Sequence, residues 1–483
     1  MICIPITEIR ARDFLAAIHE AAEVADAIEL RLDYLNATDL ASVLTAIPVV
    51  SQPLIFTFRP REQGGQRDLT LIDRQQFWRN LEPELIGYAD MELDLVESFL
   101  DRPPPIPWEK VICSYHDFES TPDNLTEVLE RLMRTPARVV KIATLARSVT
   151  DCVPVFEVID CAGARPVIAL AMGLAGVATR VLAPSRGALL TFGALRQGAE
   201  SACGQPTVGE LRDLYRVESL TRASEIYGVI GYPIGHSLSP AIHNSALAAE
   251  GRDAVYLPFE VENLNAFMRD MAHPRTRRID WRLRGLSVTI PHKLDVIAYL
   301  DEVEPLARRI GAVNTVAIEG ERLLGYNTDV MGAMSPLDDV FDVRGARVAV
   351  LGAGGAARAV LYGLAERSAE VTVYARDLKK AGVLAEEFEA RSSALENFAG
   401  DTDVVINCTP IGMKGHREGQ SPVRRDALNG VKLVYDLVYN PEDTELLKEA
   451  REMGCLTLGG MAMLTAQANA QRRIWQENQK AKR

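Results

Sequence analysis

A lysine interrupts an apolar, β-branched stretch, Val139-Val140-Lys141-Ile142-Ala143. A solvated lysine belongs on a helix face or a loop, so Lys141 in the middle of a strand points to a special role. Desolvation inside a barrel would lower its pKa and favour the neutral amine that attacks a ketone. The alternative is an ion pair with Glu29, Glu92 or Asp94, and for one strand lysine taken alone the ion pair is favoured.

Further ionisable groups lie on neighbouring apolar runs. Glu29 and Arg31 alternate with apolar residues, so both charges share one face of a strand. The next three runs carry Arg59, then Glu92 and Asp94 on one face, then Ser114-Tyr115-His116-Asp117. His116 alone would more often be a hydrogen-bonded structural histidine. Several such groups at successive strand ends favour a site.

The elements that must position these groups are eight strand-like runs. They begin near Ile2, Ala27, Leu54, Ala89, Lys110, Val139, Pro166 and Leu189. Helix-like stretches lie between most of them, for example Asp13–Val24 and Pro122–Met133. Alternating strands and helices imply parallel pairing, and eight such units over residues 1–210 predict a small (β/α)₈ barrel. Such barrels carry their active sites at the carboxyl ends of the strands.

Motifs of this half together resemble type I 3-dehydroquinate dehydratase. They are Glu29-Leu-Arg31, Phe58-Arg59 before Gly64-Gly65, Ser114-Tyr-His116-Asp117, Val140-Lys141-Ile142 and Ser201-Ala-Cys-Gly204-Gln205. The resemblance implies that Lys141 forms an imine with the C3 ketone of 3-dehydroquinate. His116 would remove the C2 proton and later protonate the leaving hydroxyl, which gives 3-dehydroshikimate.

The same resemblance implies a set of substrate contacts. Arg180 matches the arginine that clamps the carboxylate, and its planar guanidinium suits bidentate binding. The other matching positions are Glu29, Arg31, Arg59, Ser201 and Gln205.

One position departs from the family pattern, because Gln63 stands where a glutamate is usual, with Glu62 beside it. Glutamine can hydrogen-bond but cannot assist His116 as a base. Either this half works more slowly, or Glu62 turns inward, or the glutamate was never essential. A barrel that only binds a metabolite is a further alternative, although Lys141 and His116 are retained.

A new α/β region begins with the strand Ile226–Gly231. A Pro/Gly turn and two serines, Ser237 and Ser239, follow it, and Pro240 suits a first helical turn. Residues 211–225 are charged and lack Gly and Pro, which predicts a short helical linker.

A glycine turn between a strand and an apolar-periodic helix predicts a nucleotide site. After the strand Arg347–Leu351, the residues Gly352, Gly354 and Ala357 fit G-x-G-x-x-G/A, which seats a pyrophosphate on a helix N-terminus. Further strands at 370–374, 403–407 and 432–436 predict a Rossmann-type domain over residues 336–459. The cofactor residues predicted along it are Gly352, Ala353, Gly354, Gly355, Ala356 and Thr409.

The end of the second strand bears on the choice between NADP and NAD. Arg376 and Lys380 are placed to pair with a 2′-phosphate, which favours NADP. Asp377 weakens this inference because an acidic residue there could bind the ribose hydroxyls of NAD. A solvated helix start is the structural alternative for the lysines.

The block at residues 226–335 and the C-terminal helix at 460–483, with the nucleotide domain between them, resemble shikimate dehydrogenase. The resemblance implies that Lys293 exchanges a proton with the substrate oxygen and that Asp329 pairs with it. It also implies substrate contacts and two residues at the nicotinamide, and it predicts a first subdomain completed by the last helix. The substrate contacts are Ser237, Ser239, Thr289, Asn314, Tyr439 and Gln467, and the nicotinamide residues are Leu437 and Gly460.

Taken singly these residues have structural explanations, because serines cap helices, asparagines suit turns, and Lys293 could be a solvated helix start. Ser239 favours shikimate as substrate without excluding quinate. Together the halves predict an α/β bifunctional enzyme: 3-dehydroquinate loses water, and the resulting 3-dehydroshikimate is reduced by NADPH to shikimate.

Composition narrows the remaining classes of function. The net charge of −13 argues against nucleic-acid and anionic-membrane surfaces. Seven cysteines without a Cys-x-x-Cys pair indicate reduced thiols, no metal site and a cytoplasmic protein. No signal peptide is visible, and the uncharged run 166–179 is shorter than the ~20 residues that span a bilayer. The oligomeric state is left open.

Overall fold

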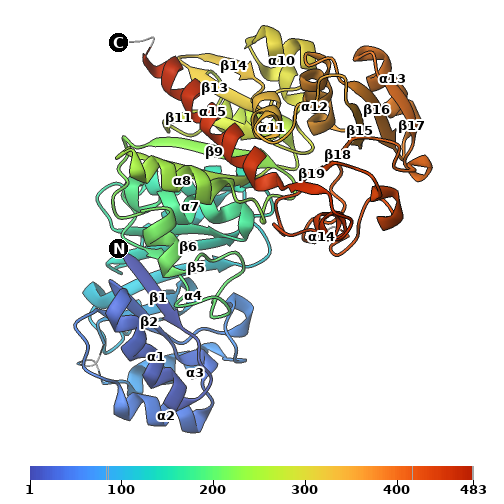
Figure 1. The fold of residues 1–483 in the computed structure, drawn as a ribbon. Helices are drawn as coiled ribbons and strands as arrows, with labels where there is room; N and C mark the ends of the chain where they lie inside the picture. Colours follow the sequence, from blue (N-terminus) through green and yellow to red (C-terminus); the bar gives the residue numbers. More distant parts are fainter. Residues whose placement is uncertain (83, 85, 416, 481–483) are drawn as a thin grey trace. The chain divides into compact units, whose positions relative to one another are not determined.

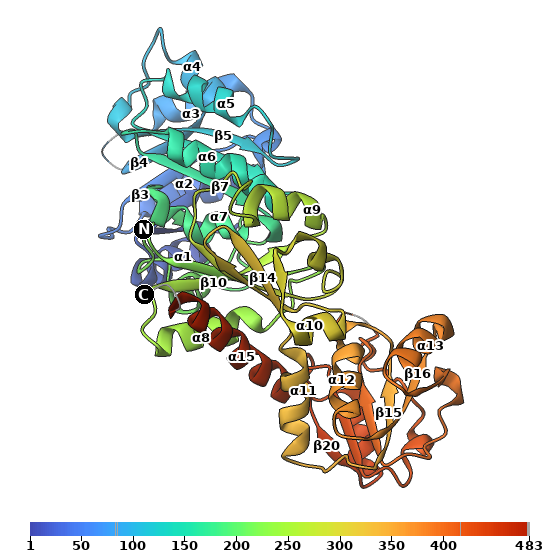
Figure 2. The same ribbon diagram turned by 90° about the horizontal axis from the view of Figure 1, so that it is seen from above.

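The computed structural model describes residues 1–82, 84, 86–415 and 417–480. The chain divides into two compact units, which are described separately (Figures 1 and 2). The first holds Met1–Ile226 with Asn244–Ala272 and Thr276–Arg282, and the second holds Tyr227–His243, His273–Arg275 and Leu283–Arg483. Across the described ranges, none of the helices has the length and apolar character needed to span a membrane.

The first unit contains the predicted barrel (Figure 1). Its strands are β1 (Ile2–Ile6), β2 (Ala27–Arg31), β3 (Leu54–Thr57), β4 (Tyr88–Glu92), β5 (Val111–Asp117), β6 (Val139–Leu145), β7 (Val167–Met172) and β8 (Thr191–Phe192). Every ladder in the order β7-β6-β5-β4-β3-β2-β1-β8 is parallel. The Leu189 N–H donates to the Val167 carbonyl at 2.8 Å, so the sheet is nearly closed. The predicted barrel is confirmed.

Helices lie between the strands along the chain, and several of them bury an apolar face. They are α1 (Ala11–Val24), α2 (Ala37–Ala46), α3 (Leu71–Asn80), α4 (Leu93–Ser98), α5 (Leu125–Met133), α6 (Cys152–Cys161) and α7 (Val177–Leu182). On α5, Leu125, Leu129 and Leu132 are buried, at the spacing of one helix face. The first unit also contains β10 (Ala254–Glu260) and α9 (Leu264–Phe267).

Two predictions about local structure were wrong. Asp94 does not share a strand face with Glu92, because β4 ends at Glu92 and Asp94 lies in the first turn of α4. The predicted helix at 211–225 is helical only over Glu210–Leu214, with π-helical hydrogen bonding. Arg216 follows with a left-handed φ of 51°, a conformation that ends a right-handed helix.

One part of the second unit is built on a mixed sheet. Helices from the stretch of sequence before the nucleotide site accompany that sheet. The strands β9 (Glu225–Gly231), β11 (Leu283–Val288), β13 (Thr315–Glu319), β14 (Arg322–Tyr326) and β12 (Glu302–Val303) are neighbours in that order. Helices α8 (Ser239–Ala249), α10 (Pro305–Ile310) and α11 (Asp329–Asp338) lie in the same region of the sequence.

The remainder is the predicted Rossmann-type sheet. Its six parallel strands run in the order β17-β16-β15-β18-β19-β20. They are β15 (Arg347–Leu351), β16 (Glu370–Ala375), β17 (Arg391–Ala394), β18 (Val404–Asn407), β19 (Leu433–Asp436) and β20 (Leu456–Leu458). Helices α12 (Gly355–Ala365), α13 (Leu378–Glu387) and α14 (Glu445–Glu452) connect them. The short strands β17 and β20 were not anticipated.

The last helix, α15 (Gly460–Lys480), returns to the mixed sheet, as predicted (Figure 2). It lies along α11, where a Cβ on Gly332 would come within 2.8 Å of the Gln467 Cβ. The Trp475 indole N–H donates to the Val316 carbonyl of β13 at 3.0 Å. Residues 481–483 of the predicted C-terminal segment lie outside the described residues.

Candidate active sites

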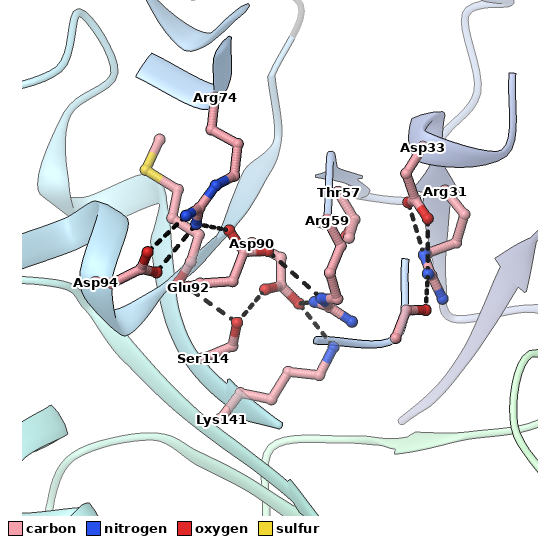
Figure 3. Close-up of polar contacts among 12 residues, drawn as sticks. Arg31, Asp33, Thr57, Arg59, Arg74, Asp90, Glu92, Asp94, Ser114 and Lys141 are labelled. Atoms are coloured by element: carbon pink, nitrogen blue, oxygen red, sulfur yellow. Dashed lines mark hydrogen bonds and ion pairs between the residues drawn. The ribbon is translucent and has the colours of Figure 1, made fainter. Parts of the chain in front are cut away.

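Lys141 is the third residue of β6, and it is only 4% exposed. Its Nζ lies 2.7 Å from the Asp90 carboxylate (Figure 3). The Glu29 carboxylate lies 3.4 Å from the same Nζ, and the centre of the Phe192 ring lies 4.4 Å from it. The ion-pair alternative is therefore what the structure contains, with Glu29 as one of the predicted partners. The closer partner, Asp90, was not predicted.

Asp90 is the central carboxylate of the barrel site. The Ser114 hydroxyl donates to it at 2.6 Å, and the Arg59 Nη2 lies 2.8 Å away in an ion pair that is not aligned as a hydrogen bond. Burial by itself would raise the pKa of Asp90, but Arg59 and Lys141 hold that pKa far below its ordinary value. Asp90 is thus a permanent negative charge beside the lysine.

His116, on β5, is buried, and within the part of the chain that the structure describes neither ring nitrogen has a hydrogen-bond partner. Burial, assisted by the cations Arg59 and Lys141, lowers its pKa well below the ordinary value, although Asp90 opposes the shift. A neutral imidazole at neutral pH is able to accept a proton. The expectation for an isolated structural histidine, a hydrogen-bonded ring, is not met.

Arg180 and the loop Glu200–Gln205 supply further polar groups. Arg180, on α7, is 1% exposed; its Nη1 donates to the Phe192 carbonyl at 3.4 Å, and its Nε has no partner among the described residues. Burial lowers the pKa of Arg180 to about 10. In the loop, the Ser201 N–H and hydroxyl donate to the Gln205 side chain at 2.8 and 3.1 Å. This loop lines a pocket of about 480 Å³.

Glu29 and Arg31 lie on β2, and the side chains of both are bound by other residues of the protein. The Thr57 hydroxyl donates to Glu29 at 2.8 Å. The Arg31 guanidinium binds both oxygens of Asp33, at 3.0 and 2.9 Å, and donates to the Gly64 carbonyl at 3.1 Å. The Asp33 pair therefore orients Arg31 near the glycine turn that follows Gln63.

Gln63 ends a short 3₁₀ turn, Arg61–Gln63, before Gly64 with φ 82°. Its side chain is half-buried and makes no hydrogen bond within the described ranges. Glu62 is exposed, so the alternative in which Glu62 turns inward is not what the structure contains. The Phe118 ring lies against Gly64, where a Cβ would meet it at 2.0 Å.

Lys293 and Asp329 form the centre of the second site. The Lys293 Nζ donates to Asp329 Oδ2 at 2.5 Å; the lysine side chain is 14% exposed and the aspartate 1%. Asp329 is the first residue of α11, and its backbone N–H donates to Asn327 at 2.9 Å. A carboxylate that accepts from an ammonium in this way fixes its orientation.

Asn314 fixes the other side of Asp329. Its amide donates to Asp329 Oδ1 at 2.7 Å and to the Thr328 hydroxyl at 2.9 Å, while its oxygen accepts the Thr328 N–H at 2.8 Å. Asn314 was predicted as a contact for substrate hydroxyls. In the structure its amide instead orients Asp329, the carboxylate that pairs with Lys293.

Several of the other predicted substrate residues are brought together from distant parts of the chain. Ser237 hydrogen-bonds Tyr439, and burial raises the pKa of the Tyr439 phenol. The Ser237 hydroxyl also accepts the Ser239 N–H at 3.3 Å. Thr289 and Gln467 are half-buried, Thr289 just after β11 and Gln467 on α15.

The predicted nucleotide turn has the required backbone. Gly352 has φ 106°, and a Cβ there would lie 3.1 Å from Thr409, so glycine is needed. Gly354 is the N-cap of α12, and no side chain caps that helix. A Cβ on Gly355 would lie 3.3 Å from the Lys293 side chain. The first turn of α12, which includes Ala356, therefore has N–H groups that could receive a pyrophosphate next to Lys293.

The residues that follow β16 bear on the alternative in which Asp377 binds the ribose hydroxyls of NAD. The Asp377 side chain caps α13 and accepts the N–H groups of Lys379 and Lys380 at 3.1 and 3.2 Å. Arg376 and Lys380 are exposed, and neither forms an ion pair in the part of the chain that the structure covers. The carboxylate that would have favoured NAD is thus engaged in capping its own helix.

Sequence reasoning missed three positions, Asp90, Asn407 and Asp436. Asp90 alternates with Ala89 and Met91 on β4, and this period of two was the signal that would have found it. Asn407 accepts the Thr409 hydroxyl at 2.7 Å and donates to Asp436 at 2.9 Å, so these two residues join the loop carrying Thr409 to the one carrying Leu437. A Cβ on Gly460 would lie 2.4 Å from the Leu437 carbonyl, so these two cofactor residues are also neighbours.

Comparisons with known proteins agree with both halves. Family models match for type I 3-dehydroquinase at residues 2–222, for the shikimate dehydrogenase substrate binding domain at 229–316, and for NADP oxidoreductase, coenzyme F420-dependent, at 347–415. The shikimate dehydrogenase (NADP(+)) of Methanothermobacter thermautotrophicus is 39% identical over 53% of this chain and 92% of its own. That of Oleidesulfovibrio alaskensis is 43% identical over 52% and 89%.

One relative spans both halves. The chloroplastic bifunctional 3-dehydroquinate dehydratase/shikimate dehydrogenase of Arabidopsis thaliana is 35% identical over 98% of this chain and 82% of its own. The present chain has a type I dehydroquinase domain followed by the domains of a shikimate dehydrogenase. It belongs to the family of bifunctional 3-dehydroquinate dehydratase/shikimate dehydrogenases.

Proposed function

We propose that this protein dehydrates 3-dehydroquinate to 3-dehydroshikimate in its barrel and reduces 3-dehydroshikimate to shikimate with NADPH in its second half. The observation that carries the proposal is that two separate sites, one built on Lys141 and one on Lys293, occur in a chain similar over 98% of its length to a bifunctional relative. The product of the first reaction is the substrate of the second.

In the dehydratase, Lys141 attacks the C3 ketone and releases water as the imine forms. The protons that the Lys141 nitrogen gives up leave with the carbonyl oxygen as that water, and Asp90 and Glu29 are the counter-ions of the protonated imine. The iminium acidifies the C2 hydrogen, and the neutral His116 accepts that proton. His116 then returns it to the leaving hydroxyl, and water hydrolyses the imine to free Lys141.

We propose Arg180 as the carboxylate clamp of this site, because its guanidinium is fully buried with Nε unengaged in the described structure. Ser201 and Gln205 supply hydrogen bonds from the opposite loop, where the buried Gln205 amide nitrogen is likewise without a partner within the described ranges. Gln63 cannot serve as a base. We infer that His116 works without a carboxylate there, with Asp90 as a fixed negative charge that favours its protonated form.

In the dehydrogenase, Lys293 donates a proton to the substrate oxygen as the ketone is reduced, and Asp329 orients that lysine. Ser237, Ser239 and Tyr439 bind the carboxylate, and Thr289 and Gln467 bind hydroxyls, while Asn314 acts through Asp329. Asp329 Oδ1 accepts from Asn314, so the acid that grips substrate is itself fixed.

NADP fits the nucleotide half. The uncapped first turn of α12 would hold the pyrophosphate, and the exposed Arg376 and Lys380 would pair with the 2′-phosphate. When bound, NADPH supplies the hydride. Leu437 and Gly460 would line the nicotinamide pocket, and Thr409 would be a further cofactor contact. Relatives named shikimate dehydrogenase (NADP(+)) support this assignment.

The domain organisation that we propose is a barrel at 1–210, a linker at 211–225, a substrate domain at 226–335 with 460–483, and a cofactor domain at 336–459. We also propose that the protein acts on small molecules in the cytoplasm. The net charge of −13 and seven cysteines that are all free thiols support that proposal.

The test is to give purified protein 3-dehydroquinate and NADPH and to quantify 3-dehydroshikimate and shikimate. Shikimate should form, should be lost in Lys141→Ala, and should return when that variant is fed 3-dehydroshikimate. Borohydride should trap substrate on wild-type Lys141 and not on the variant. If wild type reduces added 3-dehydroshikimate but never dehydrates 3-dehydroquinate or forms the adduct, the barrel is a binding module, and Gln63→Glu is the first reversion to make.

Quinate is the alternative substrate of the second half. The retained Ser239, whose N–H donates to Ser237, favours shikimate. Comparing kcat/KM for oxidation of shikimate and quinate decides between them, and a clear preference for quinate would make the enzyme catabolic.

A further inference from the structure

Arg74 lies on helix α3, outside the strand barrel, yet its side chain is only 4% exposed. It donates to Glu92 at 3.0 Å and to both oxygens of Asp94 at 3.0 and 2.5 Å (Figure 3). Asp94 is 48% exposed, so it anchors the guanidinium from the solvent side. The inner face of Arg74 is directed at Glu92.

Glu92 connects Arg74 to the barrel site. It is the last residue of β4 and 1% exposed, and its Oε1 lies 3.5 Å from the Arg59 Nε. Burial raises the pKa of Glu92 to about 7, and Asp90 adds to the shift, whereas Arg59 and Arg74 oppose it. Arg74 is thus one of two cations that favour the ionised form of this buried carboxylate.

Arg59 is the next link. Its guanidinium lies between Glu92 and Asp90, and neither contact is aligned as a hydrogen bond. The two carboxylates therefore hold its charge without engaging these N–H groups. Arg59 and Lys141 approach the same oxygen of Asp90, at 2.8 and 2.7 Å. Charges of alternating sign run from Arg74 through Glu92, Arg59 and Asp90 to Lys141.

We propose that Arg74 is a positioning residue of the barrel site, which acts through Glu92 to fix the Arg59 guanidinium beside Asp90 and Lys141. Without Arg74, Glu92 either takes up a proton or draws Arg59 away from Asp90. Both changes alter the cation that shares the Asp90 oxygen with the imine-forming lysine. The inference rests on the proposed dehydratase activity of the barrel.

The experiment is a double-mutant cycle with Arg74→Gln, Glu92→Gln and the two combined, measured in full-length protein as dehydratase kcat and KM. Each single substitution should lower dehydratase kcat/KM at least ~10-fold, because small misplacements at a reacting centre have effects of this size. The double variant should be no worse than Glu92→Gln, because Arg74 then has nothing to act on. Shikimate dehydrogenase activity of the same samples should stay unchanged, and thermal unfolding verifies that the barrel is folded at the assay temperature.

A pH profile separates positioning from a general structural effect. In Arg74→Gln the acidic limb of dehydratase kcat/KM should move to higher pH by about one unit, as expected for a buried carboxylate that loses one paired cation. The variants that carry Glu92→Gln should not show that shift, because they lack the carboxylate that takes up the proton. Arg74→Lys keeps the positive charge but lacks the two-pronged guanidinium. It should therefore restore the acidic limb of the pH profile and part of the dehydratase rate.

The matched control is Arg131→Gln on α5, which breaks an exposed 3.1 Å pair with Glu97 and should leave both activities at the wild-type level. Losses that multiply in the double variant, or an acidic limb that does not move, would overturn the inference. If Arg74→Gln does not fold, Arg74→Lys decides: several-fold lower dehydratase kcat supports the role, and wild-type kcat overturns it. A wild-type enzyme inactive on 3-dehydroquinate would instead refute the proposed function.

Discussion

Asp329→Asn perturbs the dehydrogenase site at one atom. Both oxygens of Asp329 accept from donors, Oδ2 from the Lys293 ammonium at 2.5 Å and Oδ1 from the Asn314 amide at 2.7 Å. An asparagine side chain has the same shape, but one end is itself a donor. Whichever way it is turned, an NH₂ group faces Lys293 or Asn314, in a place where the aspartate is 1% exposed.

The magnitude follows from that geometry. A lost charge-assisted hydrogen bond costs about 1.5–3 kcal/mol, and an unsatisfied buried donor about 1–3 kcal/mol. Their sum agrees with the ~3–5 kcal/mol found when one partner of a buried ion pair is removed. Because Lys293 is 14% exposed, we expect the lower part of the range. Shikimate oxidation should therefore lose about 100- to 1,000-fold in kcat/KM, which corresponds to ~2.7–4 kcal/mol.

The assay is shikimate oxidation followed by NADPH absorbance, with the dehydratase activity of the same sample as the internal standard. Asp338→Asn is the matched control, because Asp338 ends the same helix and pairs with Arg367 at an exposed position. It should change kcat/KM less than about twofold, as exposed pairs contribute little. If Asp329→Asn keeps kcat/KM within threefold of wild type, Asp329 does not orient the catalytic lysine.

Three further predictions concern pH, the glycine turn and cofactor choice. Since the folded pKa of His116 is depressed, the unfolded chain binds an extra proton below about pH 6.5, so the free energy of unfolding should fall as pH drops through 6.5. Denaturant melts at pH 7.5 and 5.5 measure this slope, which should be smaller in His116→Gln. Gly352→Ala should raise the KM for NADPH at least ~10-fold, because φ is 106° and Thr409 is 3.1 Å from the new Cβ. Arg376→Ala with Lys380→Ala should raise the KM for NADPH and leave that for NADH unchanged; an equal rise for both would contradict recognition of the 2′-phosphate.

The barrel strands were predictable because their pattern is local. A parallel barrel strand buried on both faces is a short apolar run, so each start could be found within two residues from the sequence. Polar residues that interrupt such runs, Lys141 above all, mark the inner face of the barrel. The motif around Gly352 was equally readable, since the strand, turn and helix of a nucleotide site are contiguous in the chain.

Local pattern failed where one residue changes the path of the backbone. Asp94 continues the alternation that places Glu92 on a strand face, but the chain enters α4 after Glu92, and the Asp94 side chain binds Arg74 instead. Charge and the lack of glycine predicted a helix after Leu211, whereas Arg216 takes a left-handed conformation. Propensity cannot foresee such positions, because tertiary contacts decide them.

The sequence by itself determined the fold class and the type of each reaction, and it predicted two sets of catalytic side chains, because residue chemistry and strand periodicity are written along the chain. Only the tertiary structure decided which charges meet. Lys141 pairs with Asp90, 51 residues away, and Asp329 at the start of α11 is fixed by Asn314, which immediately precedes β13. The closest partner of a buried charge depends on side-chain direction and packing, and so do the neutrality of His116 and the capping role of Asp377.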